Sequence, residues 1–326
     1  MAEHHPTASP AVLALDIGGT KLAAGVVAAD GTVLSSAVCP TRAPEGPDQA
    51  LKRLIDLGRQ AVASAGADLG GLIGTGIGCG GPLDPYTGVL TGPPHLPGWV
   101  DVPITELARA AYGHDAVLDN DGTAGAAGQW RFGAGRGSDH VVYLTLSTGV
   151  GGGAVFEGRT FRGAAGNGGE PGHVTVRSGG RRCRSCERAG CLEAYASGTS
   201  IAERAREGLA EGAGGDSALN ALEDVTAADV TAAVRAGDPF ATALWEETLD
   251  LLGSGLTSIV NLYEPEVLVL GGGVTRAADL LFEPVRRRVA AQAMGPAAAA
   301  VRIVPATGGE HAGLLGAAAV AFERLT

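Results

Sequence analysis

Positive charge is scarce in this chain of 326 residues, and long apolar runs are missing. Lys and Arg number 24 against 35 Asp and Glu, which gives a formal net charge of −11. This excess of acid argues against a broad surface for DNA or RNA. No segment approaches the roughly 18 apolar residues that cross a bilayer, and the opening MAEHHPTASP lacks the basic and apolar regions of a secretory leader. We therefore expect a cytoplasmic protein without a nucleic-acid or membrane partner.

Cysteine and aromatic residues are also few, whereas glycine is abundant. The five cysteines are an odd number, and three of them fall between 183 and 191, which in a cytosolic protein indicates a metal site before a disulfide. The 53 glycines show no three-residue period, which excludes collagen. They cluster beside apolar runs, as expected for turns whose backbone approaches a ligand. The length suggests two domains, and one large domain is the alternative.

Apolar periodicity predicts strands that alternate with helices, a pattern typical of α/β layer folds. Strands are expected at 11–17, 22–27, 72–79 and 267–274, and helices at 49–66, 122–137, 238–264 and 311–325. Asp238 and Pro239 suit the N-cap and first turn of the 238–264 helix. Residues 159–193 lack a period and are predicted to form a loop that something else holds in place.

Two segments of the chain resemble one another. LDIGGTKLAAGVVAADG (15–31) and LSTGVGGGAVFEG (146–158) each contain an apolar strand, a glycine turn and a second strand. This echo predicts two similar halves whose glycines approach one shared ligand. Chance similarity in a glycine-rich sequence is the alternative.

The glycine turn after the first strand has the chemistry of a phosphate site. Backbone N–H groups and the Thr20 hydroxyl can reach phosphate oxygens, and Asp16 can reach Mg²⁺ through water. The P-loop spacing GxxxxGK[ST] is absent, so we expect paired hairpins, with 146–153 as the second. A plain β-turn is the alternative. A GxGxxG string that ends at Gly81 is not a dinucleotide fingerprint, because Pro82 follows where a helix is required.

Asp121 follows Asn120 at a predicted junction between strand and helix. Phosphoryl transfer requires positioning, charge neutralisation and one base that accepts the hydroxyl proton. Asp121 is the candidate for that base. The alternative is an aspartate that only caps the following helix.

A Cys₃His set occupies the aperiodic region. The four residues suit a closed, tetrahedral structural zinc site, and reduced cysteines in an arginine-rich loop are the alternative. The candidate ligands are His173, Cys183, Cys186 and Cys191. Glu170 and Glu193 flank the set and can accept hydrogen bonds from sugar hydroxyls, while His173 has a second ring nitrogen for substrate. Two ordinary surface acids are the alternative.

Together these segments resemble the ROK family (repressor, open reading frame, kinase) over nearly the whole chain. The matching motifs, in order, are DIGGTK, GPLD, PGW, NDG, LSTGVGGG, ExGH, the cysteine cluster with CLE, YASG, EPEVLVLGGG and HAGLLGAA. The resemblance implies an α/β, actin-like ATPase fold, which is a duplicated ribonuclease-H-like fold with two lobes and a ligand cleft. The lobes are expected at 1–118, completed by the C-terminal helix at about 309–326, and at 119–308 with the zinc loop.

The resemblance also implies ATP-dependent, Mg²⁺-requiring phosphorylation of a hexose, most simply glucose, with Asp121 as general base. The implied sugar-binding residues are Gly81, His95, Asn120, Asp121, Glu170, His173 and Glu193. The implied nucleotide-binding residues are Asp16, Gly18, Gly19, Thr20, Lys21, Thr148, Gly149, Gly151, Gly271 and Gly272. The implied zinc ligands are again His173 and the three cysteines, and relatives suggest a homo-oligomer, either a dimer or a tetramer.

Two departures from the family pattern bear on these expectations. The usual CxC is Cys183-Arg-Ser-Cys186 here, a spacing that still closes a tetrahedron. His95 stands where similar kinases carry Asn, so another hexose, mannose or an N-acylated amino sugar such as N-acetylmannosamine is the alternative substrate, and polyphosphate the alternative donor. A sugar-sensing regulator is less expected, because about ten residues precede the first strand and a helix-turn-helix needs more.

Overall fold

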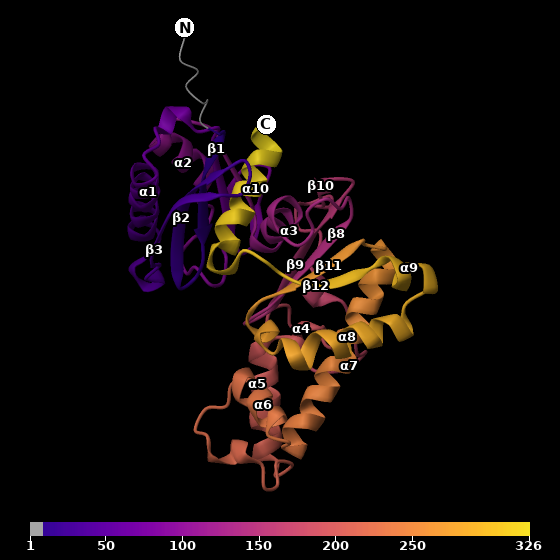
Figure 1. The fold of residues 1–326 in the computed structure, drawn as a ribbon. Helices are drawn as coiled ribbons and strands as arrows, with labels where there is room; N and C mark the ends of the chain where they lie inside the picture. The colour runs from indigo at the N-terminus through magenta and orange to yellow at the C-terminus, as the bar shows by residue number, and fades with distance from the viewer. Residues whose placement is uncertain (1–8) are drawn as a thin grey trace. The chain divides into compact units, whose positions relative to one another are not determined.

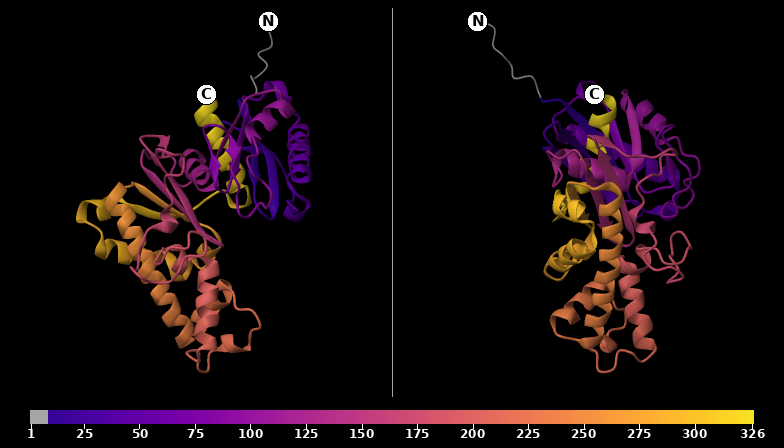
Figure 2. Two further views of the ribbon diagram at one scale, coloured as in Figure 1. Left: turned by 180° about the vertical axis from the view of Figure 1, so that it is seen from behind. Right: turned by 90° about the vertical axis from the view of Figure 1, so that its right-hand side faces the viewer.

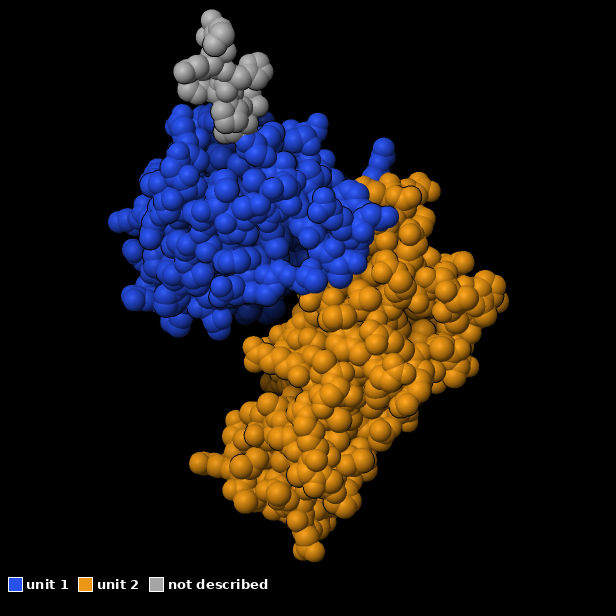
Figure 3. All heavy atoms as spheres, viewed as in Figure 1, with its two compact units in different colours: residues 1–137, 159–168, 307–326 blue, residues 138–158, 169–306 orange. Residues whose placement is uncertain are grey.

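The computed structural model describes residues 9–326, which divide into two compact units (Figure 3). Unit 1 contains the chain up to Gly137 together with Arg159–Gly168 and Thr307–Thr326, and unit 2 contains Ser138–Gly158 and Gly169–Ala306. Residues 119–137 and 159–168, which were expected in the second lobe, belong to unit 1 instead. Among residues 9–326, no helix is long and apolar enough to span a membrane.

Unit 1 is built on a five-stranded sheet in the order β3-β2-β1-β4-β7. Its strands are β1 (Ala11–Ile17), β2 (Lys21–Ala28), β3 (Val33–Pro40), β4 (Thr75–Cys79) and β7 (Ala116–Asn120). The first three strands form an antiparallel meander, and β1, β4 and β7 are parallel. Ile17 pairs with Cys79, which pairs with Asn120. The segments that follow these three strands therefore start from one edge of the sheet, where α/β folds bind ligands.

Helices cover both faces of this sheet (Figures 1 and 2). One face packs on α1 (Pro47–Ser64) and α2 (Ile104–Tyr112), and the other on α3 (Asp121–Phe132) and α10 (Ala312–Leu325). A Cβ on Gly128 of α3 would lie 2.9 Å from the backbone nitrogen of Gly316 in α10. The two helix backbones can approach this closely because neither residue has a side chain. This packing of α3 against α10 places 121–132 in unit 1. Unit 1 also contains the short strands β5 (Leu83–Asp84), β6 (Val89–Leu90) and β10 (Arg159–Thr160).

The sheet of unit 2 repeats the strand pattern of unit 1. Four strands lie in the order β9-β8-β11-β12, with β8 (Val141–Leu146) and β9 (Val150–Phe156) antiparallel and β11 (Val267–Gly271) and β12 (Arg302–Pro305) parallel to β8. This order corresponds to β2-β1-β4-β7 of unit 1. The sequence echo is thus the first hairpin of each sheet, and the predicted duplication is present.

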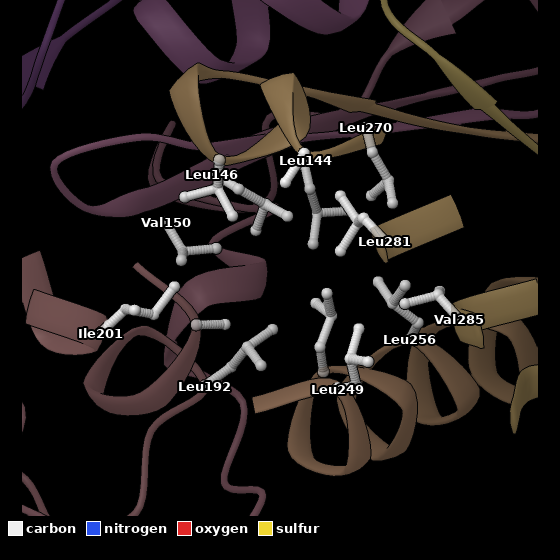
Figure 4. Packing of buried hydrophobic residues seen from close by; sticks show 14 of the residues in the cluster. Leu144, Leu146, Val150, Leu192, Ile201, Leu249, Leu256, Leu270, Leu281 and Val285 are labelled. Carbon is white, nitrogen blue, oxygen red and sulfur yellow. The ribbon is translucent and has the colours of Figure 1, made fainter. Parts of the chain in front are cut away.

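The helices of unit 2 bury one large apolar cluster against this sheet (Figure 4). They are α4 (Glu193–Ala196), α5 (Gly198–Ala210), α6 (Ala227–Arg235), α7 (Pro239–Tyr263), α8 (Ala278–Gln292) and α9 (Gly295–Ala300). Leu144 and Leu146 of β8 contribute to the same cluster as Leu256 of α7 and Leu281 of α8. The Asp238 carboxylate caps α7 by accepting a hydrogen bond from Ala241 N–H at 3.0 Å, as predicted.

Candidate active site and metal centre

Asp121 is the first residue of α3, directly after β7. Asn120 is the N-cap of this helix, and its Oδ1 accepts a hydrogen bond from Gly122 N–H at 2.8 Å. Asp121 Oδ1 also accepts from Gly122 N–H at 2.8 Å. Because Asn120 already caps the helix, the Asp121 carboxylate is not needed as the cap. It reaches solvent, but the surrounding protein atoms raise its pKa, while the Gly122 hydrogen bond and His95 oppose this shift.

A second carboxylate lies near Asp121 in the same unit. Burial raises the pKa of Asp16 to about 6, the negative charge of Asp121 adds to the shift, and Lys21 opposes it. The first turn of α10 lies directly against Asp16, since a Cβ on Gly313 would overlap the carboxylate. Two carboxylates at one edge of the sheet form an acidic site of the kind that holds a hydrated divalent cation.

His95 packs between two glycines near these acids. A Cβ on Gly80 would lie 2.6 Å from the ring carbon Cε1 of His95, and one on Gly19 would lie 2.8 Å from its carbonyl oxygen. Burial lowers the pKa of His95, and the charge of Asp121 opposes this. The ring is therefore neutral at neutral pH, with one donor and one acceptor nitrogen. A Cβ on Gly81 would lie 3.4 Å from Asn120 Nδ2, so the predicted Gly81, His95, Asn120 and Asp121 gather at one edge of the sheet.

The glycine turn of unit 1 joins β1 to β2. Gly18 N–H donates to the Lys21 carbonyl at 3.0 Å, and the Thr20 and Lys21 side chains are exposed. Gly18 and Gly19 are partly accessible. The predicted phosphate-binding residues of this unit therefore form one solvent-accessible turn.

A buried ion pair, which the sequence analysis missed, lies beneath Asn120. Asp119 is fully buried, and Arg162 Nε donates to its Oδ2 at 2.7 Å. Arg162 also donates to Glu323 of α10 at 3.3 Å, and Asp119 Oδ1 accepts from Asn120 N–H at 3.1 Å. Arg162 lies 43 residues from Asp119 in the chain, in a stretch without periodicity, so no local sequence signal indicated this pair.

The predicted metal ligands lie together in unit 2. One donor atom from each of His173, Cys183, Cys186 and Cys191 lies within 4.8 Å of the other three. His173 Nδ1 is 3.9 Å from Cys183 Sγ, and Cys186 Sγ is 3.4 Å from Cys191 Sγ. Zinc–sulfur bonds of about 2.3 Å in a tetrahedron place sulfurs about 3.8 Å apart. The donor set and its spacing therefore fit a structural zinc ion, and Nδ1 is the histidine nitrogen that faces the cluster.

The two predicted sugar-binding glutamates have different environments. Glu170 is exposed and precedes the 3₁₀ turn η3 (Pro171–His173). Glu193 is only 8% exposed, and its Oε2 accepts a hydrogen bond from Val150 N–H at 2.9 Å. Its Oε1 accepts hydrogen bonds from the Ser185 hydroxyl and from the Cys183 thiol. Glu193 thus contacts both the metal cluster and the hairpin of β8 and β9.

A cavity of about 570 Å³ opens beside that hairpin, and all of its walls belong to unit 2. The predicted Thr148 lines it together with Ser147 from the hairpin turn and Gly273 after β11. Gly271 ends β11, Gly272 follows it, and Gly151 lies in β9. The lining residues that the sequence analysis missed include Thr199, Arg206, Thr226, Arg235 and Arg276. They belong to the stretches around α5, α6 and β11, where no motif singled them out.

The comparisons with known proteins agree with this fold. The ROK family profile matches residues 12–324. A glucokinase from Thermotoga maritima is 34% identical over 319 residues, which is 96% of this chain and 98% of that protein. The crystal structure of a ROK hexokinase from Thermus thermophilus aligns with a TM-score of 0.83 and 36% identity, and covers 97% of this chain and 99% of its own.

A ROK glucokinase from Streptomyces griseus, crystallised with glucose and AMPPNP, aligns with a TM-score of 0.75 and 32% identity, and covers 96% of this chain and 99% of its own. The fold and these similarities define a sugar kinase of the actin-like ATPase class. More specifically, the chain belongs to the ROK family.

Proposed function

We propose that this protein catalyses the ATP-dependent phosphorylation of glucose to glucose 6-phosphate, with Asp121 as the general base. The observation that carries the proposal is the position of Asp121 directly after β7, where Asn120 supplies the cap and the surrounding protein atoms raise the pKa of the aspartate. A base whose pKa lies closer to neutral accepts a hydroxyl proton more readily in the transition state. Asp121 would remove the proton of the 6-hydroxyl as that oxygen attacks the terminal phosphorus of ATP.

Each unit supplies its own part of this chemistry. In unit 1, Asn120, His95 and Gly81 would bind sugar hydroxyls. The turn Gly18–Thr20 would bind phosphate oxygens, and Asp16 would hold Mg²⁺ through water, which neutralises charge on the transferred group. The gathering of these residues at one sheet edge supports this assignment.

In unit 2, the cavity beside the β8–β9 hairpin would bind the nucleoside, with Thr148 and Gly149 near its phosphates. The exposed Glu170 and the second ring nitrogen of His173 would bind sugar hydroxyls. The glucose and AMPPNP bound by the Streptomyces griseus protein support both ligands for this chain. We extend the proposal to a cytoplasmic homo-oligomer, as the family resemblance implies.

The Cys₃His cluster would hold one structural Zn²⁺ through His173 Nδ1 and the three cysteine sulfurs. A closed four-ligand site supplies no reactive position; it orders the loop that carries its ligands. Metal analysis of the purified protein checks this assignment, and the expected result is one zinc per chain. Copurified iron or no metal at all would contradict it.

A coupled assay with a sugar panel tests the activity itself. We expect ATP-dependent product formation with glucose, which requires added Mg²⁺ and gives the highest kcat/KM of the panel. The panel includes mannose and N-acetylmannosamine because His95, which packs against Gly19 and Gly80, stands where similar kinases carry Asn. An imidazole in place of an amide would change the contacts with sugar hydroxyls. A higher kcat/KM with either sugar would assign the kinase to that substrate, and the absence of turnover with all three would refute the proposal.

A further inference from the structure

The turn between β1 and β2 is held by a residue that lies outside it in the chain. We propose that Thr41 is a positioning residue for this turn, because it binds the carbonyl oxygens of Gly18 and Thr20. The amide groups of Gly19 and Thr20 then stay available for phosphate oxygens of the nucleotide. This inference rests on the proposed function, in which the turn binds phosphate. It adds a buried residue that would act through the turn and not by touching the nucleotide itself.

The first observation is the pair of hydrogen bonds between Thr41 and the turn. Thr41 Oγ1 donates to the Gly18 carbonyl at 2.6 Å, and Thr41 N–H donates to the Thr20 carbonyl at 3.0 Å. Thr41 is fully buried, whereas Thr20 is exposed. A carbonyl oxygen carries a partial negative charge and would repel a phosphate. Thr41 therefore binds these two oxygens on the buried side of the turn.

The second observation concerns the amide groups of the turn. Gly18 N–H donates to the Lys21 carbonyl at 3.0 Å, which closes the turn. The N–H groups of Gly19 and Thr20 have no acceptor in the described part of the chain, and both residues are accessible to solvent. Successive free N–H groups in a turn make a concavity that binds anions. Thr41 thus engages acceptors of the turn and leaves these two donors free.

The register of the sheet brings Thr41 to the turn. β3 pairs with β2 at the edge of the sheet (Figure 1), and the pair at the end of β3 joins Pro40 to Lys21. Thr41 follows Pro40, so its hydrogen bond to Thr20 extends this pairing by one residue beyond the strand. Its hydroxyl then reaches Gly18, which lies 23 residues away in the chain. The contact therefore depends on the meander and not on a local motif.

A third observation is that α1 fixes the position of Thr41. Arg53 of α1 donates from Nη2 to the Thr41 carbonyl at 2.5 Å, and from Nη1 to Glu45 Oε2 at 2.6 Å. A charged donor makes a strong hydrogen bond, and α1 itself packs against β2 and β3. Thr41 thus links the turn to a packed helix. The turn is therefore positioned before any nucleotide binds, which lowers the cost of binding.

The decisive experiment compares Thr41→Val with Thr41→Ser in the full-length protein. Valine keeps the branched shape and the backbone N–H but lacks the hydroxyl, whereas serine keeps the hydroxyl. We expect Thr41→Val to raise the Kd for AMPPNP, measured by calorimetry with Mg²⁺, about tenfold, because the Gly18 carbonyl loses its donor. Thr41→Ser should recover most of this affinity. The Kd for adenosine, which has no phosphate, and the Kd for glucose should each change less than about twofold.

Thr105→Val is the matched control. Thr105 Oγ1 donates to the Gly88 carbonyl at 3.4 Å, so this variant loses the same kind of hydrogen bond in the same unit, at a different glycine. It should leave the AMPPNP Kd unchanged. An unchanged AMPPNP Kd in Thr41→Val would overturn the positioning role. So would an equal rise in the two valine variants, or an equal loss of adenosine and AMPPNP binding, because either result would indicate a general effect on unit 1.

Hydrogen exchange of the ligand-free protein, followed by NMR, tests the same link without a nucleotide. The Gly18 amide, which donates to Lys21, should exchange faster in Thr41→Val than in the wild type, because a turn with a loose carbonyl opens more often. The same amide should be unchanged in Thr105→Val. Equal exchange of the Gly18 amide in Thr41→Val and the wild type would overturn the inference.

The outcomes separate this inference from the proposed function. If the wild type phosphorylated glucose and Thr41→Val bound AMPPNP as tightly as the wild type, the inference alone would fail. If the wild type bound AMPPNP more tightly than Thr41→Val but phosphorylated no sugar, the proposed kinase activity would fail and the inference would stand. If the wild type did not bind AMPPNP, both would fail.

Discussion

The two sheets share one strand pattern, but the carboxylates beside their first hairpins have different hydrogen-bond partners. In unit 1, Asp16 and Asp121 lie near one another, and the surrounding protein atoms raise the pKa of both carboxyl groups. In unit 2, Glu193 accepts hydrogen bonds at both oxygens from a backbone amide, a hydroxyl and a thiol. A carboxylate that accepts few hydrogen bonds from the protein is suited to binding a cation or a proton. A carboxylate whose two oxygens both accept hydrogen bonds from the protein is suited to holding those donor groups in place.

The largest expected effect concerns the support beneath the unit 1 acids. Arg162→Ala leaves the Asp119 carboxylate buried without its guanidinium partner, and breaking a buried pair on one side costs about 3–5 kcal/mol. We expect a loss of this size in the free energy of unfolding, measured by urea denaturation. Arg159→Ala, which removes an exposed arginine three residues earlier, is the control, and equal stability of the two variants would contradict the structure.

A medium effect is expected at the unit 2 hairpin. Gly149→Ala places a methyl group against Glu193 Oε2, and overpacking of this kind costs about 1–3 kcal/mol. Urea denaturation should show that loss, together with weaker AMPPNP binding. Gly295→Ala is the control, because nothing lies within 4 Å of its added Cβ, and stability should barely change there.

The smallest effect contrasts the two kinds of acid directly. The pKa of Asp16 in the folded protein is about 6, above the ordinary value of 3.8, so the folded state binds more protons than the unfolded state between these values, and stability falls as pH rises through that range. Asp16→Asn should therefore gain about 1–2 kcal/mol at pH 8, after allowance for solvent screening of the full shift, and nothing below pH 4.

Glu193→Gln should instead lose stability at pH 8, because it replaces a carboxylate that has donors at both oxygens. Urea denaturation of both variants at pH 4 and pH 8, without Mg²⁺, makes the comparison. A gain in both variants, or a loss in both, would show that the two acids have equivalent roles.

The features that the sequence predicted are those with local signals. The two glycine hairpins, the Asp238 cap and the grouping of three cysteines with His173 all follow from neighbouring residues or short spacings. The expected strand and helix at 267–274 and 311–325 are largely β11 and α10.

The features that the sequence did not predict depend on contacts between distant segments. The Asp119–Arg162 pair joins a strand to a segment whose sequence has no apolar period, and the cavity beside the β8–β9 hairpin collects residues from α5, α6 and the turn after β11. The role of Glu193 as a sugar ligand stays a prediction. The burial of Glu193 and its hydrogen bond with Val150 N–H depend on a contact between residues that are 43 positions apart in the chain, which no spacing reveals.

The central claim is that Asp121 removes the sugar proton, and the most direct test is the variant Asp121→Asn. Asparagine keeps the size of the side chain but cannot accept the proton, and loss of a general base lowers turnover by about 10²–10⁴-fold. We expect kcat for glucose to fall by such a factor while the Kd for glucose, measured by calorimetry, changes less than about threefold. A kcat near that of the wild type would contradict the account.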